Sequence, residues 1–477
     1  MSHRSKSTEG MVLVSLIAST SLGGCTTSPS APNLGGIYNK AAQETSHNRN
    51  PVVVMPGILG SKLIDEESQR DVWGAFSGNY ANPEKADGAR LLALPMRMGA
   101  PLSELDDTVV ANGVLDQLEV SIFGLNIQLN AYLNILGTLG VGGYRDSLLG
   151  ESGAIDYGPG HYTCFQYAYD WRLDISQNAR AFGAQIRKAS RIAQEGMKLK
   201  TPPKVDVVAH SMGGLLLRYY LRYGDQPLPE DGSLPELTWA GAELIDHAIL
   251  IATPNAGSAE SLLQLVDGIR FAPFFPKFEA ALLGTMPSLY QLLPRPRHGA
   301  YVDSKTGQPL GDEMYDADFW SEMNWGLADP DQDAMLVKLL PGVDDEGERR
   351  RIALDHLQKC LSVAQQFHAA IDVPATPPPG LHLHLFAGDA DSTVSVLAIN
   401  TTTGDVRVKA HAPGDGTVLR TSAIMDERVG QTWVPRVQSP IEWRTVQFIF
   451  RDHLGLTKDP QFTDNVLYLL LEQPRDH

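Results

Sequence analysis

The segment from Val205 to Gly214, VDVVAHSMGG, decides the fold of this chain. Its first five residues form a short, β-branched, apolar run that is typical of a buried strand. Residues 215–223 predict a helix, which ends at Gly224. Ser211 lies between the two, so we expect it on the sharp strand-to-helix turn that exposes a nucleophilic hydroxyl.

That turn is strained, and it tolerates only small side chains two positions before and after the serine. Ala209 and Gly213 occupy those positions, so the pattern is Ala-x-Ser-x-Gly in place of the usual Gly-x-Ser-x-Gly. The alternative is a glycine-rich turn with an ordinary exposed serine. The strand, the helix and the spacing agree with each other, and together they favour a nucleophile at Ser211.

Strand-like runs recur along the chain, with helical patterns between them. The strand-like runs cover residues 51–55, 162–169, 248–252, 381–386, 405–409 and 447–450, and the helical patterns cover 175–198 and 462–471. This alternation predicts an α/β fold with a mostly parallel central sheet covered by helices on both faces. Irregular text near 73–150 and 258–375 predicts two insertions, a lid and a cap, within one domain at 49–477.

The composition is that of an ordinary globular protein. The chain has 477 residues, a formal net charge of −17 and 43% hydrophobic residues, which is enough to bury a large core. Disordered and collagen-like classes are excluded, and the acidic balance argues against a nucleic-acid partner. Three cysteines, Cys25, Cys164 and Cys360, are too few for a disulfide scaffold.

The N-terminus reads as a targeting signal. Arg4 and Lys6 precede a mostly apolar run at 11–22, and Leu22-Gly-Gly-Cys25 resembles the lipobox of bacterial lipoproteins. We therefore expect a lipoprotein signal peptide at 1–24, lipidation of Cys25 and a flexible tether at 25–48. The alternatives are an ordinary secretory signal and a disordered N-terminus.

The same signal predicts an exported cell-envelope lipoprotein that touches a membrane surface through its lipid anchor. Thr26, rather than Asp, follows Cys25, which is compatible with sorting to the outer membrane if the host has two membranes. After residue 25 there is no stretch of about 18 consecutive apolar residues, so the mature body is not expected to span a membrane.

A serine nucleophile needs a histidine to take its proton and a carboxylate to orient that histidine. In this fold the chain order is Ser, then Asp or Glu, then His. His453 follows the last apolar strand and precedes the closing helix, so it is the predicted base. The alternatives His382, His384 and His411 lie before or on strands, and His453 could also be a plain surface loop residue.

The acid has two serious candidates. Asp415 lies in Gly-Asp-Gly-Thr-Val, between two glycines that allow a tight turn, whereas Asp389 and Asp391 follow a more convincing core strand. Residue reasoning alone favours Asp415 only modestly.

Acyl transfer also needs two backbone N–H groups that face the developing oxyanion. Met212, directly after the nucleophile, supplies one. The loop Gly57-Ile58-Leu59-Gly60 after the first strand is the predicted source of the other, at Ile58, although it could be a simple strand-ending turn. The chain has no His-Glu-x-x-His motif and no clustered metal ligands, so neither a metal nor a cofactor is expected.

Five motifs follow one another along residues 51–471: Pro56-Gly-Ile-Leu-Gly-Ser61, Tyr169-Asp-Trp-Arg172, Ala209-His-Ser-Met-Gly-Gly214, Met286-Pro-Ser288 with Leu293-Pro294, and Gly414-Asp-Gly-Thr-Val418. With these motifs in this order, the chain resembles a bacterial member of the lecithin:cholesterol acyltransferase family, an α/β-hydrolase family. The resemblance implies an α/β-hydrolase fold, strengthens Asp415 as the acid and agrees with His453 as the base. Eukaryotic members carry a disulfide near the first insertion that no cysteine here can replace, so their lid geometry cannot be transferred to Trp73.

The resemblance also implies the substrate. A glycerophospholipid would donate its acyl group to Ser211, and the acyl-enzyme would pass it to a lipid alcohol or to water. Aromatic side chains suit a lipid-facing lid, although they could equally fill the cap's own core; the candidates are Trp73, Trp171, Phe271, Phe274 and Phe275, with Phe278 nearby. Two alternatives stay open: a simple lipase, phospholipase A or carboxylesterase without transferase activity, and a non-catalytic lipid-binding lipoprotein.

Overall fold

The computed structural model describes most of the chain after residue 30. The described residues are 31–46, 48–75, 78–105, 107–115, 120–122, 125–127, 131–149, 161–271 and 275–475. The predicted signal peptide at 1–24, Cys25 and Phe274 lie outside them. Within these ranges, no helix has both the length and the apolar character needed to cross a membrane.

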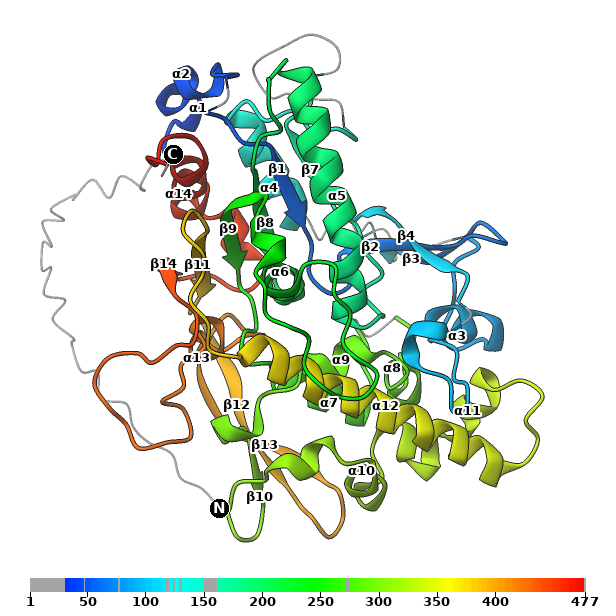
Figure 1. Cartoon of the computed structure of the whole chain (residues 1–477). Helices are drawn as coiled ribbons and strands as arrows, with labels where there is room; N and C mark the ends of the chain where they lie inside the picture. Colours follow the sequence, from blue (N-terminus) through cyan, green and yellow to red (C-terminus); the bar gives the residue numbers. More distant parts are fainter. Residues whose placement is uncertain are drawn as a thin grey trace, which may run out of the picture. The chain divides into compact units, whose positions relative to one another are not determined.

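A six-stranded sheet forms the centre of the fold, and all five of its strand pairings are parallel. Figure 1 shows its strands from left to right in the order β14, β11, β9, β8, β1 and β7. Their bounds are Trp443–Ile449, His382–Gly388, Ile245–Ile251, Val205–His210, Val52–Met55 and Cys164–Gln166. The predicted parallel α/β architecture is therefore confirmed.

Helices cover both faces of this sheet because its strands are apolar on both sides. Val53 and Val207 point to one face, where they pack in a core with α5 (Ile175–Gly196), α6 (Met212–Tyr223) and α12 (Glu346–Asp372). Val52 and Val208 point to the opposite face and pack with α4 (Ala131–Val141) and α14 (Pro460–Leu471).

The first predicted insertion differs from expectation at both ends. A small antiparallel sheet of β3 (Arg70–Trp73), β2 (Ser61–Asp65) and β4 (Val109–Val114) begins at residue 61 rather than near 73, and it precedes a hairpin of β5 (Val120–Ile122) and β6 (Leu125–Ile127). α3 (Ala86–Leu92) packs on β3. α4 lies within the predicted insertion but contributes Tyr132 and Ile135 to the core beside the central sheet. The glycine-rich sequence around α4 does not predict this helix, although it belongs to the core fold.

The second insertion is mostly helical. It contains α7 (Glu260–Asp267), α8 (Ala280–Leu283), α9 (Pro287–Gln291), β10 (Tyr301–Asp303), α10 (Ala317–Met323), α11 (Asp333–Leu339) and α12. The strand-like text at 405–409 does not join the central sheet. It belongs to β13 (Val406–Gly414), which pairs with β12 (Asp391–Ile399) and, through it, with β10; α13 (Arg420–Ile424) follows.

Part of the segment expected as a flexible tether, residues 25–48, is folded. Residues Leu34–Ile37 and Asn39–Ala42 form the short helices α1 and α2. Tyr38 between them is only 2% exposed, and its hydroxyl donates to the carboxylate of Asp464 in α14 at 2.7 Å. An aromatic anchor thus fixes this segment to the domain.

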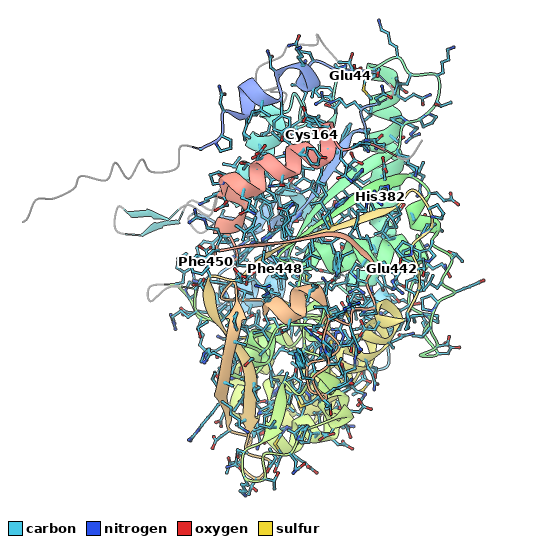
Figure 2. The ribbon with its side chains drawn as sticks, turned by 90° about the vertical axis from the view of Figure 1, so that its left-hand side faces the viewer. Glu44, Cys164, His382, Glu442, Phe448 and Phe450 are labelled. Atoms are coloured by element: carbon cyan, nitrogen blue, oxygen red, sulfur yellow. The ribbon has the colours of Figure 1, made fainter. Side chains whose placement is uncertain are left out.

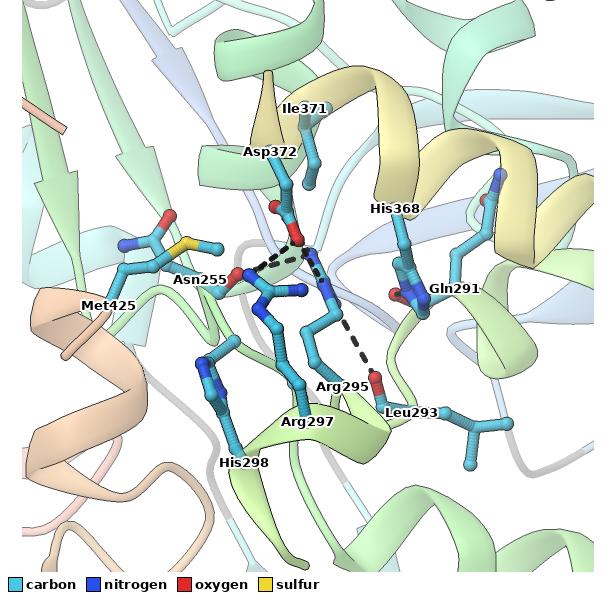
Figure 3. Close-up of polar contacts among 12 residues, drawn as sticks. Asn255, Gln291, Leu293, Arg295, Arg297, His298, His368, Ile371, Asp372 and Met425 are labelled. Carbon is cyan, nitrogen blue, oxygen red and sulfur yellow. Dashed lines mark hydrogen bonds and ion pairs between the residues drawn. The ribbon is translucent and has the colours of Figure 1, made fainter. Parts of the chain in front are cut away.

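A buried ion-pair network connects the second insertion to the loop after β9 (Figure 3). Asp372, at the end of α12, accepts from Arg295 Nε at 2.9 Å and lies 3.0 Å from the Arg297 guanidinium. Arg295 also donates to the carbonyl of Asn255 at 3.2 Å. Burial raises the pKa of Asp372, but the charge and hydrogen bonds of Arg295 outweigh burial and lower it to about 2.

We expect Asp372→Asn to lower the free energy of unfolding by about 3–5 kcal/mol at neutral pH, because it leaves Arg295 buried without its counter-charge. Asp225→Asn is the matched control: Asp225 and its partner Arg187 have side chains 47% and 51% exposed, so its cost should stay below about 1 kcal/mol. Urea unfolding of the three proteins measures both effects.

The pH dependence follows from the sign of the shift. A carboxylate whose folded pKa is lowered stabilises the fold above its ordinary value, 3.8 for Asp372, and this contribution is lost as the pH falls through about 2. The difference in the free energy of unfolding between wild type and Asp372→Asn should therefore decrease below about pH 4. A difference that stays constant below about pH 4 would contradict the lowered pKa of Asp372.

Candidate active site

Ser211 lies at the turn between β8 and α6, with φ 53° and ψ −125°. A non-glycine residue in this backbone region is strained, and such strain occurs mainly at functional positions. The space around the turn explains the small residues beside it: a Cβ on Gly213 would lie 2.3 Å from the carbonyl oxygen of Pro56, and one on Gly214 would lie 2.0 Å from Thr253 Oγ1. Ala209 already has a Cβ, and this methyl group is accommodated because it packs in the core.

The structure brings Ser211, His453 and Asp415 together, although 242 residues separate the first two. The Oγ of Ser211 lies 3.1 Å from Nε2 of His453, and Nδ1 of His453 lies 2.8 Å from Oδ2 of Asp415. These distances are those of hydrogen bonds, and the order serine, histidine, carboxylate is that of a proton-transfer triad.

The loop around Asp415 fixes its carboxylate. Oδ1 accepts from the backbone N–H groups of Thr417 at 2.9 Å and Val418 at 2.7 Å, which leaves Oδ2 for the histidine. The N–H of His453 donates to the carbonyl of Asp415 at 2.9 Å, so the backbones of the two residues are also joined. Asp415 is 2% exposed, and the histidine therefore faces a buried, oriented anion.

The alternative acids lie beside the Asp415 loop but contact other groups. Asp389 forms an ion pair with Arg420 at 2.6 Å, and Asp391 begins β12 opposite Gly414. Both follow β11, as Asp415 follows β13, but only Asp415 meets the histidine.

The alternative histidines also lie away from the site. His384 Nε2 lies 2.9 Å from Nδ1 of His247, at the start of the central sheet. Figure 2 shows the separation: His382 lies at one end of the sheet, and Phe448 and Phe450, which precede His453, lie at the other. His411 is on β13, outside the central sheet.

The predicted oxyanion loop is a tight turn against the nucleophile. The N–H of Gly60 donates to the carbonyl of Gly57 at 3.1 Å, and Leu59 has φ 63°, a conformation that side chains rarely adopt. A Cβ on Gly57 would lie 2.7 Å from the Cβ of Ser211, so the loop and the nucleophile are in direct contact.

Neighbouring side chains use the polar groups of this turn. The carbonyl of Pro56 accepts from Tyr169 at 2.9 Å, that of Leu59 from Trp73 Nε1 at 2.8 Å, and that of Ser61 from Trp171 Nε1 at 3.2 Å. Within the described part of the chain, the N–H groups of Ile58 and Met212 have no hydrogen-bond partner. These are the two donors that the sequence predicts for an oxyanion.

The aromatic lid candidates have different positions. Trp73 and Trp171 are buried beside the oxyanion turn, with ring centroids 5.5 Å apart, so they support the turn from behind. Phe271 packs on Trp73 at 5.6 Å but is 40% exposed, whereas Phe275 is buried. Of the described candidates, only Phe271 presents an apolar surface to the outside.

Two residues near the nucleophile escaped the sequence reasoning. The hydroxyl of Tyr132 in α4 accepts from the N–H of Gly57 and lies 3.4 Å from Nδ1 of His210, and Nε2 of His210 contacts the backbone of His453. Tyr132 lies in the segment that the sequence predicts as an insertion, and no sequence pattern there indicates a contact with the nucleophile. In the described ranges, no group of three or more His, Cys, Asp or Glu side chains is arranged to hold a metal ion.

Comparison with known proteins agrees with the motifs. The family model for lecithin:cholesterol acyltransferase matches residues 148–334. The human phosphatidylcholine-sterol acyltransferase is 25% identical over 234 residues, which cover 47% of this chain and 48% of that protein, so the chain spans about half the length of this curated relative. The resemblance to the family is therefore confirmed for that part of the chain.

A solved structure resembles the whole fold. A chain in the crystal structure of the Tle4–Tli4 complex matches with a TM-score of 0.53 and 16% identity, covering 90% of this chain and 99% of that one. At this identity the likeness concerns the fold alone. Together with the parallel sheet, it supports the expected α/β-hydrolase architecture.

The geometry predicts that Ser211 reacts with a fluorophosphonate. His453→Ala should slow labelling by at least about 100-fold, because the hydroxyl loses its base. Asp389→Asn is the control for Asp415→Asn: the first should leave the labelling rate within about twofold and the second should reduce it by orders of magnitude. In-gel fluorescence against time measures the rates. Equal labelling of wild type and His453→Ala would show that Ser211 is not activated.

Proposed function

From the family resemblance and the site geometry, we propose that this chain is a serine-dependent enzyme that acts on acyl esters of membrane lipids. The observation that carries the proposal is the continuous contact from Ser211 Oγ through His453 to Asp415, at 3.1 and 2.8 Å. Beside it lie the backbone N–H groups of Ile58 and Met212, which have no hydrogen-bond partner among the described residues. A nucleophile, a base and donors for an oxyanion are the requirements of acyl transfer.

In the first half-reaction, Ser211 Oγ attacks the ester carbonyl of a glycerophospholipid while His453 Nε2 takes the hydroxyl proton. The buried carboxylate of Asp415 stabilises the imidazolium that forms. The carbonyl oxygen becomes an oxyanion between the N–H groups of Ile58 and Met212. His453 then protonates the departing lysolipid oxygen, and the acyl group stays on Ser211.

In the second half-reaction, a lipid alcohol or water attacks the acyl-enzyme. His453 takes the proton of the acceptor and returns it to Ser211 Oγ. An alcohol gives a new ester and makes the enzyme an acyltransferase, whereas water gives a free fatty acid and makes it a phospholipase. The human relative is named for transfer to a sterol, and we propose a lipid alcohol as the acceptor here.

Two alternatives are less well supported. A simple lipase or carboxylesterase would use the same first half-reaction, so only its products distinguish it. A non-catalytic lipid-binding lipoprotein would have no need for a strained serine in contact with a histidine. The φ of 53° at Ser211 therefore favours an enzyme.

For the location, we propose a cell-envelope lipoprotein that is anchored through lipidated Cys25. The whole chain has a formal net charge of −17, so electrostatic attraction to anionic lipid does not contribute to membrane binding. Contact with the membrane would come from the anchor and from exposed apolar side chains such as Phe271 and Phe450.

The test of function uses purified wild type beside Ser211→Ala, with phospholipid vesicles that contain or lack a long-chain alcohol or sterol. We expect new ester from the wild type when the alcohol is present, and a decrease of at least about 10³-fold with Ser211→Ala, because the nucleophile is lost. Chromatography separates ester from free fatty acid. Fatty acid alone would identify a phospholipase, and no serine-dependent product would contradict enzymatic function.

The anchor has a separate test. In a bacterial host, the wild type should enter the membrane fraction with a lipid-modified N-terminal cysteine, and Cys25→Ser should lose both properties because its hydroxyl cannot form the thioether. Mass spectrometry of the N-terminal peptide measures the modification. A wild-type N-terminus without lipid would exclude the lipoprotein assignment.

A further inference from the structure

A line of polar contacts runs behind the nucleophile from the oxyanion turn to the predicted base. The N–H of Gly57 donates to the hydroxyl of Tyr132 at 2.8 Å, and that hydroxyl lies 3.4 Å from Nδ1 of His210. Nε2 of His210 lies 3.2 Å from the carbonyl oxygen of His453. Three segments far apart in sequence, the turn after β1, α4 and the loop after β14, thus meet through two side chains.

Chemistry fixes the direction of every hydrogen bond in this line. The hydroxyl oxygen of Tyr132 accepts from Gly57, so its one proton is free to be donated to Nδ1 of His210. Nδ1 must then be unprotonated, and the ring proton of neutral His210 is on Nε2, where it donates to the carbonyl of His453. One tautomer satisfies all three contacts, and the other would leave the carbonyl without a donor.

The surroundings of His210 favour its neutral form. It is 1% exposed, and burial, followed by the charge of nearby His453, lowers the pKa of His210 to about 3. Its ring lies 4.9 Å from the ring of His453. A second positive charge at that distance would oppose the imidazolium that must form on His453, so a neutral His210 can support the base without repelling it.

Tyr132 and His210 each lie next to a group that the proposed reaction uses. Tyr132 is 7% exposed, and its hydroxyl oxygen is the hydrogen-bond partner of the Gly57 N–H. Next along the chain is Ile58, whose N–H is the proposed oxyanion donor. His210 is the residue before Ser211, so its side chain and the nucleophile share one short piece of backbone.

We propose that Tyr132 and His210 are positioning residues that act as one relay, holding the Ile58 N–H and the imidazole of His453 in register with Ser211 Oγ. This inference rests on the proposed function, because it concerns the geometry of the same reaction. Oxyanion stabilisation and proton transfer both fall steeply when groups move by a fraction of an ångström. Neither side chain touches the reacting atoms, so the relay should affect turnover and leave substrate affinity unchanged.

The test is a double-mutant cycle with Tyr132→Phe and His210→Leu on hydrolysis of a soluble short-chain nitrophenyl ester. Each single variant should lower kcat by about 10- to 100-fold with KM within about twofold, because the loss is in the transition state. The double variant should be no slower than about twofold below the slower single one, since either change already breaks the relay. His210→Gln, whose amide can donate to His453 and accept from Tyr132, should recover most of kcat.

Tyr223→Phe is the matched control. Tyr223 is also buried and its hydroxyl donates to a backbone carbonyl, that of Ala370 at 2.7 Å, but it lies outside the site. It should leave kcat within about twofold of the wild type. Thermal unfolding of every variant shows whether the protein is folded; if His210→Leu does not fold, Tyr132→Phe and His210→Gln carry the test.

Three results would overturn the relay, and the first two are an unchanged kcat in Tyr132→Phe and losses that multiply in the double variant. A kcat that falls only together with a rise in KM would do the same, since it would indicate a general distortion of the site. Failure of the proposed function is distinguishable, because wild type and Ser211→Ala would then hydrolyse the ester equally. An active wild type with an unaffected Tyr132→Phe contradicts the relay alone.

Discussion

The backbone contact between the end of β1 and the start of α6 is the constraint on which the site depends. Gly57 touches the side chain of Ser211, and Gly213 touches the carbonyl of Pro56, at distances that leave no room for a Cβ. Two neighbouring parallel strands, β1 and β8, end side by side, and the turns that follow them interlock. The sheet thus brings the nucleophile and the predicted oxyanion turn into contact, and the side chains around the turn keep them in that arrangement.

The first insertion is part of this support. Trp73 belongs to β3 of the small antiparallel sheet, and its indole N–H holds the carbonyl of Leu59, the residue with the strained φ. Trp171, after β7, holds the carbonyl of Ser61 in the same way. A turn with a non-glycine residue at φ 63° needs such outside contacts, because its own backbone disfavours it. A segment that looks irregular in sequence therefore supports part of the proposed site.

The sequence predicts what is encoded locally and misses what depends on distant contacts. The elbow at Ser211 could be recognised because strand, turn and helix lie within 20 residues, and His453 because chain order left few candidates. Asp415 and Asp389 could not be separated by local pattern, since both follow strands; the ion pair of Asp389 with Arg420 distinguishes them only in space. Tyr132 was missed because its partners Gly57 and His210 lie 75 and 78 residues away.

The position of these supporting residues bears on whether the proposed enzyme would pass its acyl group to water or to a lipid alcohol. In the proposed mechanism, the attacking serine, its base and the oxyanion donors are fixed by buried residues, so they would act in the same way on any acceptor. The choice between water and a lipid alcohol would then depend on exposed apolar side chains around the site. Phe271 packs on Trp73 and is 40% exposed, and Phe450 is 76% exposed three residues before His453. Water would reach the acyl-enzyme least when these apolar side chains are covered. Contact with a membrane surface would therefore favour transfer over hydrolysis without altering Ser211, His453 or Asp415.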